Sequence, residues 1–169
     1  ANKALELVEA HHLFGVGDDQ LDAIVHPGSL VHGMVHLHDG TTLMQMSAPD
    51  MAGPIRWALT AGNHDASIAP SFDPLDLSTL EFAPVDSDRF PFVELGFEVI
   101  RKGGAAGCVL NAADEVCVQA FLTGRIPFLD VYHFVAEAVD RFGHHDPHSL
   151  TDILHLDAAV RDDVTNRLP

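Results

Sequence analysis

The alternation of apolar and polar residues predicts helices at both ends of the chain and strands between them. Residues 2–14 have the periodicity of a helix, and Gly15 is suited to end it because glycine accepts the left-handed conformation of a helix C-terminus. Residues 21–27 are typical of a short strand closed by a proline. Asp39-Gly40 predicts a hairpin, since this dipeptide favours the tight turn between two antiparallel strands.

The pattern changes at about residue 61. A short helix, started or interrupted at Pro54, is predicted just before it, and residues 61–89 carry several prolines and little periodicity, which indicates a linker. Four segments with helical periodicity follow, joined by short connections, at 90–104, 105–124, 127–143 and 149–168. The pattern therefore predicts an α+β protein, with a hairpin-containing sheet before the linker and a four-helix bundle after it.

The composition adds limits on the partners of this protein. The chain has 169 residues, of which 25 are acidic and 9 basic, so its net charge is −16. Nucleic acids and anionic membranes attract basic patches, and the sequence has no basic stripe, which argues against both as partners. The apolar runs are also shorter than the roughly 20 residues of a membrane-spanning helix. We expect a cytoplasmic protein in which Cys108 and Cys117 are reduced core residues.

Twelve histidines invite a metal-binding hypothesis. His32, His36 and His38 alternate along a predicted strand, so they share one face and could chelate an ion. Zinc sites usually show cysteine, glutamate or histidine partners at characteristic spacings, and none accompanies these residues. We favour solvated or hydrogen-bonded histidines, and an acidic, histidine-rich metal-binding protein stays open as an alternative.

Three polar residues at the start of the first helix offer a different chemistry. At 100° per residue, Asn2, Lys3 and Glu6 fall within about 100° of one another. Lys3 is a point charge suited to a phosphate, Asn2 is an amide donor, and Glu6 is a hard oxygen ligand for Mg²⁺ or Mn²⁺. By spacing alone, a solvated face in which Lys3 and Glu6 form an ordinary ion pair is the simpler interpretation.

Several longer stretches of the sequence, taken together, resemble the motifs of a known protein family. They are NKALELVEAHHLF at 2–14, IVHPGSLVHGMV at 24–35, HDGTTLMQMSAPDMAGPI at 38–55, LDLSTLEFAPVDSDRFP at 75–91, LNAADEVCVQAFL at 110–122 and FLDVYHFVAEAV at 128–139. Their order and spacing agree over the whole chain, from Asn2 to the last predicted helix. Together they resemble the 1-deoxy-D-xylulose 5-phosphate reductoisomerase family.

The resemblance implies an activity and a domain plan. Members of this family use NADPH and Mg²⁺ or Mn²⁺ to convert 1-deoxy-D-xylulose 5-phosphate to 2-C-methyl-D-erythritol 4-phosphate, in the non-mevalonate route to isoprenoids. The family fold has an N-terminal NADPH-binding domain, an α/β catalytic domain with the homodimer contact, and a C-terminal four-helix bundle. By this resemblance, residues 1–60 are the remainder of the catalytic domain, residues 61–89 the linker and residues 90–169 the bundle.

The resemblance also gives roles to single residues. Asn2 and Lys3 match the pair that holds the substrate phosphate. Glu6 matches a catalytic residue that is one of three acidic metal ligands, and His32 matches a catalytic histidine of the substrate site. In this view the Lys3–Glu6 spacing belongs to a ligand site rather than to an ordinary surface pair.

Two further residues are implied to contact the cofactor. The chain also departs from the family pattern at several positions, among them the WP usual after the helix at Ala58, where AGNHD stands. Pro49 and Met51 match the segment that packs near the nicotinamide end of NADPH. The arginine usual after this segment is absent, and Ala52 stands there. The motif NAANE is NAADE in this chain, with Asp114 in place of the second asparagine.

The resemblance covers only the later part of such an enzyme. The chain begins inside a predicted helix, and it carries no dinucleotide-binding fingerprint and no further acidic metal pair upstream of Glu6. We therefore expect the C-terminal part of a longer enzyme, missing its N-terminal half and inactive by itself. The alternative is a non-catalytic dimerisation or scaffold module derived from the same fold.

Overall fold

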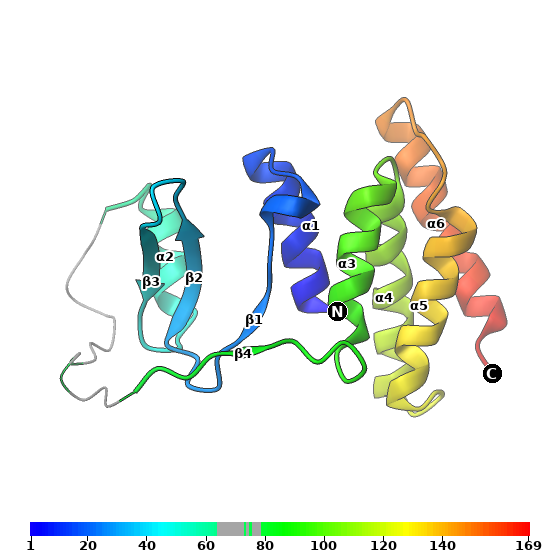
Figure 1. The fold of residues 1–169 in the computed structure, drawn as a ribbon. Helices are drawn as coiled ribbons and strands as arrows, with labels where there is room; N and C mark the ends of the chain where they lie inside the picture. The colour runs from blue at the N-terminus through cyan, green and yellow to red at the C-terminus, as the bar shows by residue number, and fades with distance from the viewer. Residues whose placement is uncertain (64–72, 74, 76–78) are drawn as a thin grey trace. The chain divides into compact units, whose positions relative to one another are not determined.

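The structure is a computed structural model that describes residues 1–63, 73, 75 and 79–169. The chain divides into two compact units (Figure 1). Ala1–Ala23 and Asp86–Pro169 make up the helical unit, and Ile24–Val85 is the strand unit. The helices of one unit and the antiparallel strand pairs of the other confirm the predicted α+β class.

The helical unit, whose residues are all described, contains five α-helices. The first, α1, spans Asn2–Phe14, and a 3-10 turn, η1, follows at Asp18–Gln20. Gly15 ends α1 with a φ of 65°, in the left-handed region, as predicted. The four helices predicted after the linker are all present, as α3 (Pro91–Lys102), α4 (Ala106–Leu122), α5 (Phe128–Phe142) and α6 (Leu150–Arg167).

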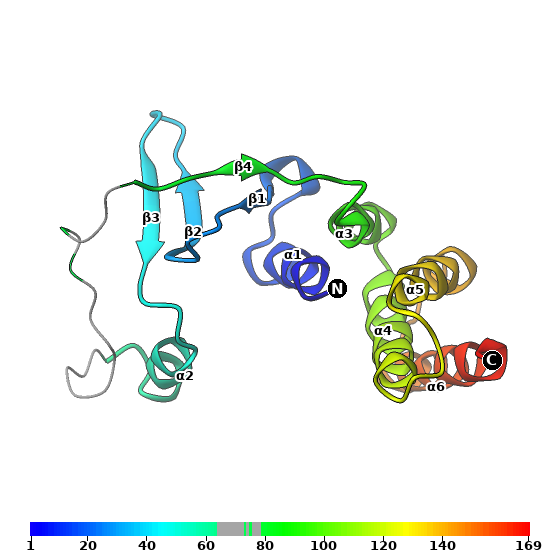
Figure 2. The ribbon, with the colours of Figure 1, turned by 90° about the horizontal axis from the view of Figure 1, so that it is seen from below.

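Helix α4 lies at the centre of this unit, between α3 and α6 (Figure 2). Its buried face is rich in small residues such as Ala113, which lets neighbouring helices come close. Valines four residues apart put one apolar stripe on each of the outer helices, Val135 and Val139 on α5 and Val160 and Val164 on α6. All four valines are fully buried, so these stripes and α4 form the core.

Helix α1 belongs to this core as well. Ala4 is fully buried, and a Cβ built on Gly96 of α3 would lie 2.9 Å from the Cα of Ala4. The two backbones can approach this closely because Gly96 has no side chain. The division into segments 1–60, 61–89 and 90–169 stays a prediction, as does a bundle of four helices without α1.

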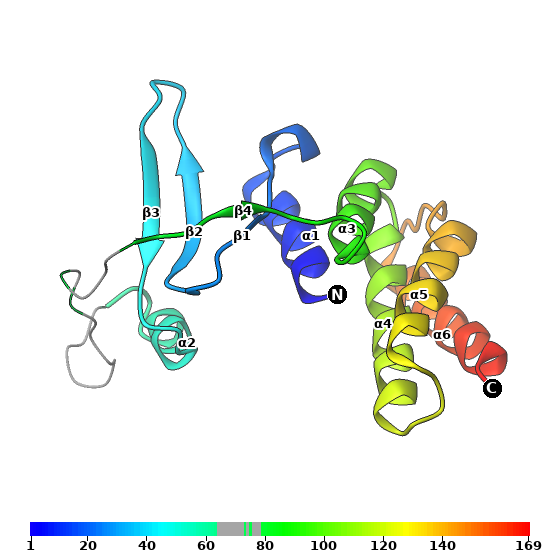
Figure 3. The same cartoon turned by 60° about the horizontal axis from the view of Figure 1, so that its bottom comes forward.

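The strand unit contains the predicted hairpin. β2 (Val31–His36) pairs antiparallel with β3 (Thr42–Met46), and the turn between them holds Asp39-Gly40 (Figure 3). The strand predicted at 21–27 is only two residues long, β1 (Ile24–Val25). It pairs with β4 (Ala83–Pro84), which lies inside the segment predicted as linker.

The short helix of the strand unit is α2 (Ala52–Leu59). Pro54 is its third residue rather than its start or a break. A proline is tolerated there because the amide groups of the first helical turn have no acceptor within the helix. Across the part of the chain that the structure describes, no helix is both long enough and apolar enough to cross a bilayer.

Candidate functional site

The first turn of α1 presents Asn2, Lys3 and Glu6 to solvent. Ala4 and Leu7, on the opposite face, are buried against the helical core, and this fixes the rotation of α1 about its own axis. Lys3 Nζ lies 2.5 Å from Glu6 Oε2, and each of these two side chains is 55% exposed. The structure thus brings Lys3 and Glu6 into contact.

The Lys3–Glu6 pair is easily exchanged for a ligand. An exposed ion pair contributes only about 0–1 kcal/mol to stability, because water and salt screen it and two long side chains must be ordered. An anion could therefore replace Glu6 as the partner of Lys3 at little cost, and a cation could replace Lys3 as the partner of Glu6.

The described residues do not complete a metal site. No group of three or more His, Cys, Asp or Glu side chains gathers among them in a way that could hold an ion. Mg²⁺ prefers six oxygen ligands, so the carboxylate of Glu6 fits the chemistry of such an ion but supplies a single ligand. His32, His36 and His38 likewise form no such group, although His36 and His38 were predicted to share a face with His32.

His32 sits at an irregularity in the hairpin. Val31 pairs with Met46 and Gly33 with Gln45, so His32 is an extra residue on β2, in a β-bulge. Its Nε2 donates to the carbonyl oxygen of Ser47 at 3.2 Å. When neutral, this tautomer leaves Nδ1 of the exposed ring as a hydrogen-bond acceptor.

The segment of Pro49 and Met51 follows directly. Asp50 Oδ1 accepts a hydrogen bond from the backbone N–H of Ala52 at 2.9 Å, which fixes the chain where it enters α2. Met51 is the residue at the start of α2, and it is 68% exposed. Because His32 is bonded to Ser47, the histidine and this segment are tied together within the strand unit.

The predicted site residues therefore fall into two groups. Asn2, Lys3 and Glu6 lie in the helical unit, and His32, Pro49 and Met51 lie in the strand unit. Within each group the residues share one turn of helix or one short stretch of backbone.

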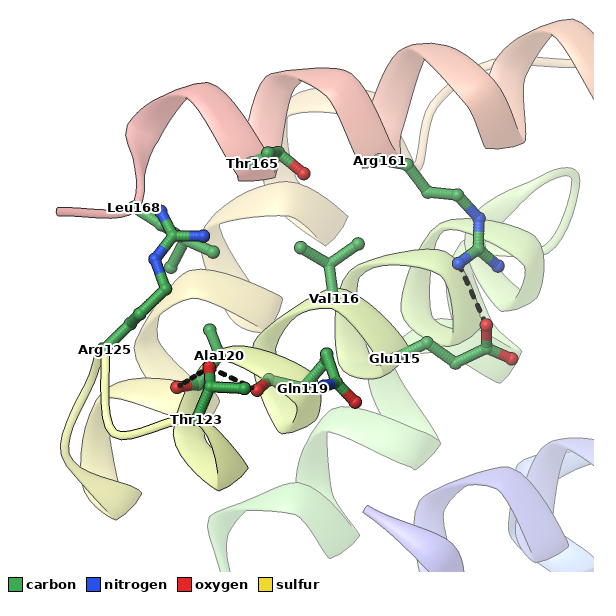
Figure 4. A pocket seen from close by; sticks show the side chains of 9 residues that line it. All are labelled: Glu115, Val116, Gln119, Ala120, Thr123, Arg125, Arg161, Thr165 and Leu168. Atoms are coloured by element: carbon green, nitrogen blue, oxygen red, sulfur yellow. Dashed lines mark hydrogen bonds and ion pairs between the residues drawn. The ribbon is translucent and has the colours of Figure 1, made fainter.

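A hollow of about 350 Å³ lies between α4 and α6 of the helical unit (Figure 4). On one side of it, Arg161 Nη1 lies 2.9 Å from Glu115 Oε2, and Arg161 Nε lies 2.7 Å from Asp157 Oδ2. Two carboxylates thus neutralise this guanidinium. None of the predicted site residues lines the hollow, which is formed by Glu115, Val116, Gln119, Ala120, Thr123, Arg125, Arg161, Thr165 and Leu168.

Asp114, which departs from the family motif, has a burial that the spacing argument did not predict. It is the buried charged residue of the described chain, with 9% of its surface exposed, and its Oδ1 has no hydrogen-bond partner. Burial raises the pKa of Asp114 above its ordinary value of 3.8. A sequence signal did exist, because an aspartate inside an apolar helix is costly to bury unless it is hydrogen-bonded or paired with a charge.

Comparisons with known proteins decide the family. The family described as DXP reductoisomerase C-terminal domain matches residues 46–163. The chain belongs to the 1-deoxy-D-xylulose 5-phosphate reductoisomerase family. The resemblance drawn from the motifs is thereby confirmed.

Full-length relatives agree with this assignment. The chain is 40% identical over 160 residues to the 1-deoxy-D-xylulose 5-phosphate reductoisomerase of Solibacter usitatus, covering 95% of the chain and 40% of the relative. It is 41% identical to that of Chlamydia muridarum, covering 95% and 42%. The chain therefore spans about two fifths of the length of these curated relatives.

Solved structures of the family also match. The reductoisomerase from Zymomonas mobilis in complex with NADPH superimposes with a TM-score of 0.88 at 38% identity, covering 98% of this chain and 44% of that one. A reductoisomerase in complex with NADPH, fosmidomycin and magnesium gives a TM-score of 0.89 at 34% identity, covering 98% and 43%. Members of the family are thus known in complexes with NADPH and with magnesium.

Proposed function

We propose that this chain is part of a reductoisomerase that converts 1-deoxy-D-xylulose 5-phosphate to 2-C-methyl-D-erythritol 4-phosphate with NADPH and Mg²⁺ or Mn²⁺. The observation that carries the proposal is the identity of 40% over 160 residues to an enzyme named for this activity. The exposed first turn of α1 supports it, because a lysine, an amide and a carboxylate are available there for a phosphate and a metal.

Asn2 and Lys3 hold the substrate phosphate. The ammonium of Lys3 leaves Glu6 and forms charge-assisted hydrogen bonds to phosphate oxygens, which are about twice as strong as neutral ones. The amide of Asn2 donates a further hydrogen bond and is insensitive to pH. The weak Lys3–Glu6 pair keeps both side chains ordered and ready until the substrate arrives.

Glu6 provides one of the metal ligands, and residues outside 1–169 supply the others. When bound, the metal polarises oxygens of the substrate. Release of Lys3 to the phosphate frees the carboxylate of Glu6 for this role. The two events are therefore coupled through one ion pair.

His32, Pro49 and Met51 complete the contribution of the chain. The free Nδ1 of His32 accepts a hydrogen bond from a substrate hydroxyl, while Nε2 stays bound to Ser47. Met51, an exposed and polarisable side chain, covers one face of the nicotinamide, with Pro49 beside it. NADPH itself binds mainly to a domain outside these residues, so the 169 residues alone are inactive.

The enzyme works as a cytoplasmic homodimer. Support for the dimer comes from the hairpin, where Val35 and Leu43 on the two-stranded sheet and Leu37 in its turn are exposed apolar side chains. Open sheet edges with apolar side chains are suited to pairing with a second copy. The same hairpin would serve a non-catalytic dimerisation module, which is the second candidate function.

The test is turnover of the protein expressed from its complete reading frame. We expect consumption of NADPH that requires both 1-deoxy-D-xylulose 5-phosphate and Mg²⁺ or Mn²⁺. Glu6→Gln should leave the fold intact and lower this turnover by at least roughly 10–100-fold, because mutation of a residue that only supports a metal ligand already costs that much. Glu9→Gln, an exposed carboxylate of the same helix, is the matched control and should be silent. A complete protein that dimerises without turnover would favour the scaffold function instead.

A further inference from the structure

His26 joins the segment that the sequence predicted as linker to the beginning of the strand unit. Its ring Nδ1 donates a hydrogen bond to the backbone carbonyl oxygen of Glu81 at 2.8 Å, across 55 positions of the sequence. The ring also lies against Phe82, with 4.9 Å between the two ring centroids. Aromatic pairs at this separation attract each other beyond the apolar area that they bury. Two contacts thus fasten Glu81 and Phe82 to His26.

The backbone next to this contact is paired only briefly. Directly before His26, β1 pairs antiparallel with β4, in a register that places Val25 opposite Ala83. Each of these strands is two residues long, and an isolated pair of strands is marginally stable even when it is longer. The side-chain contacts of His26 are therefore needed to hold this pairing.

The ring stays in this position although one of its nitrogens gains nothing there. Nε2 of His26 is buried and has no hydrogen-bond partner among the described residues, which carries a cost. A Cβ built on Gly28 would lie 3.2 Å from Cε1 and 3.3 Å from Nε2 of the ring. The ring thus contacts both the linker segment and the turn that follows His26 in the chain.

This turn is strained. Ser29 has a φ of 50°, which is uncommon for a residue with a side chain. Its backbone N–H donates to the carbonyl oxygen of His26 at 3.1 Å. A residue keeps such a conformation only where the contacts around it impose it. Because His26 imposes it through this hydrogen bond, the anchoring of the His26 ring bears directly on the turn at 26–29.

Two further hydrogen bonds lead from the turn to His32. The carbonyl oxygen of Leu30 accepts from the backbone N–H of Ser47 at 3.1 Å, and the carbonyl oxygen of Ser47 accepts from Nε2 of His32 at 3.2 Å. Ser47 is therefore held by two residues that come shortly after the turn. A shift of the turn moves Leu30, and with it the acceptor that fixes the ring of His32.

We propose that His26 is a positioning residue, which fastens Glu81 and Phe82 to the turn before β2 and thereby fixes the ring of His32 for its contact with the substrate. The inference rests on the proposed function, because that function gives His32 the substrate contact. His26 does not touch the substrate. Its effect passes through the turn at 26–29 and through Ser47.

The experiment compares variants of the protein expressed from its complete reading frame. His26→Leu removes the donor to Glu81 and keeps an apolar side chain, whereas His26→Asn keeps an amide donor near the position of Nδ1. His36→Leu is the matched control, since Nδ1 of His36 also forms a 2.8 Å hydrogen bond, to Thr42 Oγ1, but at the other end of β2. If His26→Leu does not fold, Gly28→Ala, which crowds the same ring, takes its place.

The readouts are KM and kcat for 1-deoxy-D-xylulose 5-phosphate, and hydrogen exchange of the backbone amides of Ser29 and Ser47. We expect His26→Leu to raise KM roughly two- to tenfold, the effect of one lost hydrogen bond, with kcat changed less than about twofold. Exchange at both amides should become faster. His26→Asn should restore both readouts, and His36→Leu should change neither.

A double-mutant cycle separates positioning from a general loss of structure. In His32→Ala the contact that His26 serves is already gone, so adding His26→Leu should not raise KM further. An equal further increase would overturn the inference, as would unchanged KM in His26→Leu alone. An unmutated protein without turnover would instead count against the proposed function. Exchange would still test the fastening in that case, and unchanged exchange at Ser29 and Ser47 in His26→Leu would overturn it.

Discussion

Gly96 and Ala4 lie so close together that a Cβ at position 96 would come within 2.9 Å of the Cα of Ala4. This contact joins two residues that are 92 positions apart, and it fixes α1 to α3. Asn2, Lys3 and Glu6 project from the opposite side of the same helix. The position of the candidate phosphate and metal ligands on the helical unit thus depends on the absence of a side chain at Gly96.

Gly96→Ala should destabilise the protein by about 1–3 kcal/mol, because the added methyl group meets backbone rather than a flexible side chain. Gly107→Ala is the matched control, since Gly107 is also helical and a Cβ there meets a side-chain atom, Cγ1 of Val8 at 3.3 Å, rather than backbone. Alanine favours a helix over glycine by about 0.5–1 kcal/mol, so the control should be neutral or stabilising. Urea unfolding gives the change in the free energy of unfolding for each variant. Equal changes in the Gly96→Ala variant and the control would contradict the close contact between Gly96 and Ala4.

The buried carboxylate of Asp114 predicts a dependence of stability on pH. Burial raises the pKa of Asp114 in the folded protein above the value of 3.8 expected when unfolded. Between these two pKa values the folded protein holds a proton that the unfolded chain has lost, so the free energy of unfolding falls as pH rises through this window.

Asp114→Asn removes this titration and should melt at a higher temperature than the unmutated protein at pH 7. This difference in melting temperature should vanish below the pKa of Asp114 in the unfolded chain, because the aspartate and the asparagine are then both neutral. Thermal melts at a series of pH values check this. A variant less stable than the unmutated protein at pH 7 would show that Asp114 is stabilised by its charge.

The two cysteines should differ in reactivity. Burial, together with the nearby Asp114 carboxylate, raises the pKa of Cys117 to about 12. Cys108 is partly exposed, although burial raises the pKa of its thiol too. A thiol reagent at pH 8 should label the folded protein at Cys108 first, since thiolate and access are both needed.

Two single-thiol variants, Cys108→Ala and Cys117→Ala, separate the two rates. Both remaining thiols should react alike once the protein is unfolded in urea. Equal rates in the folded state would mean that α4 opens readily, against the core position of Cys117.

Ser149 should contribute to stability through a single hydrogen bond. Its Oγ accepts from the backbone N–H of Asp152 at 3.1 Å, at the start of α6. Ser149→Ala should therefore cost about 1 kcal/mol, the usual effect of losing such a cap. Ser149→Asp preserves an acceptor and should cost much less. Chemical unfolding of the three proteins gives the comparison, and no loss in the alanine variant would show that the cap is unimportant.

The sequence by itself determined the local elements and the family. Helical periodicity, the Gly15 stop and the Asp39-Gly40 turn involve residues within a few positions of one another, so they are readable without the fold. Asn2, Lys3 and Glu6 were predicted on one face for the same reason. Motif order was enough to identify the reductoisomerase family, which the comparisons confirm.

Only the tertiary structure decided which elements pack together. Contacts such as that of Ala4 with Gly96 show that α1 packs among the helices that follow the linker, and no local pattern predicted this packing. The β-bulge at His32 depends on how two strands pair, and the burial of Asp114 depends on the helices around α4. These features arise from contacts between residues distant in sequence, which local pattern does not encode.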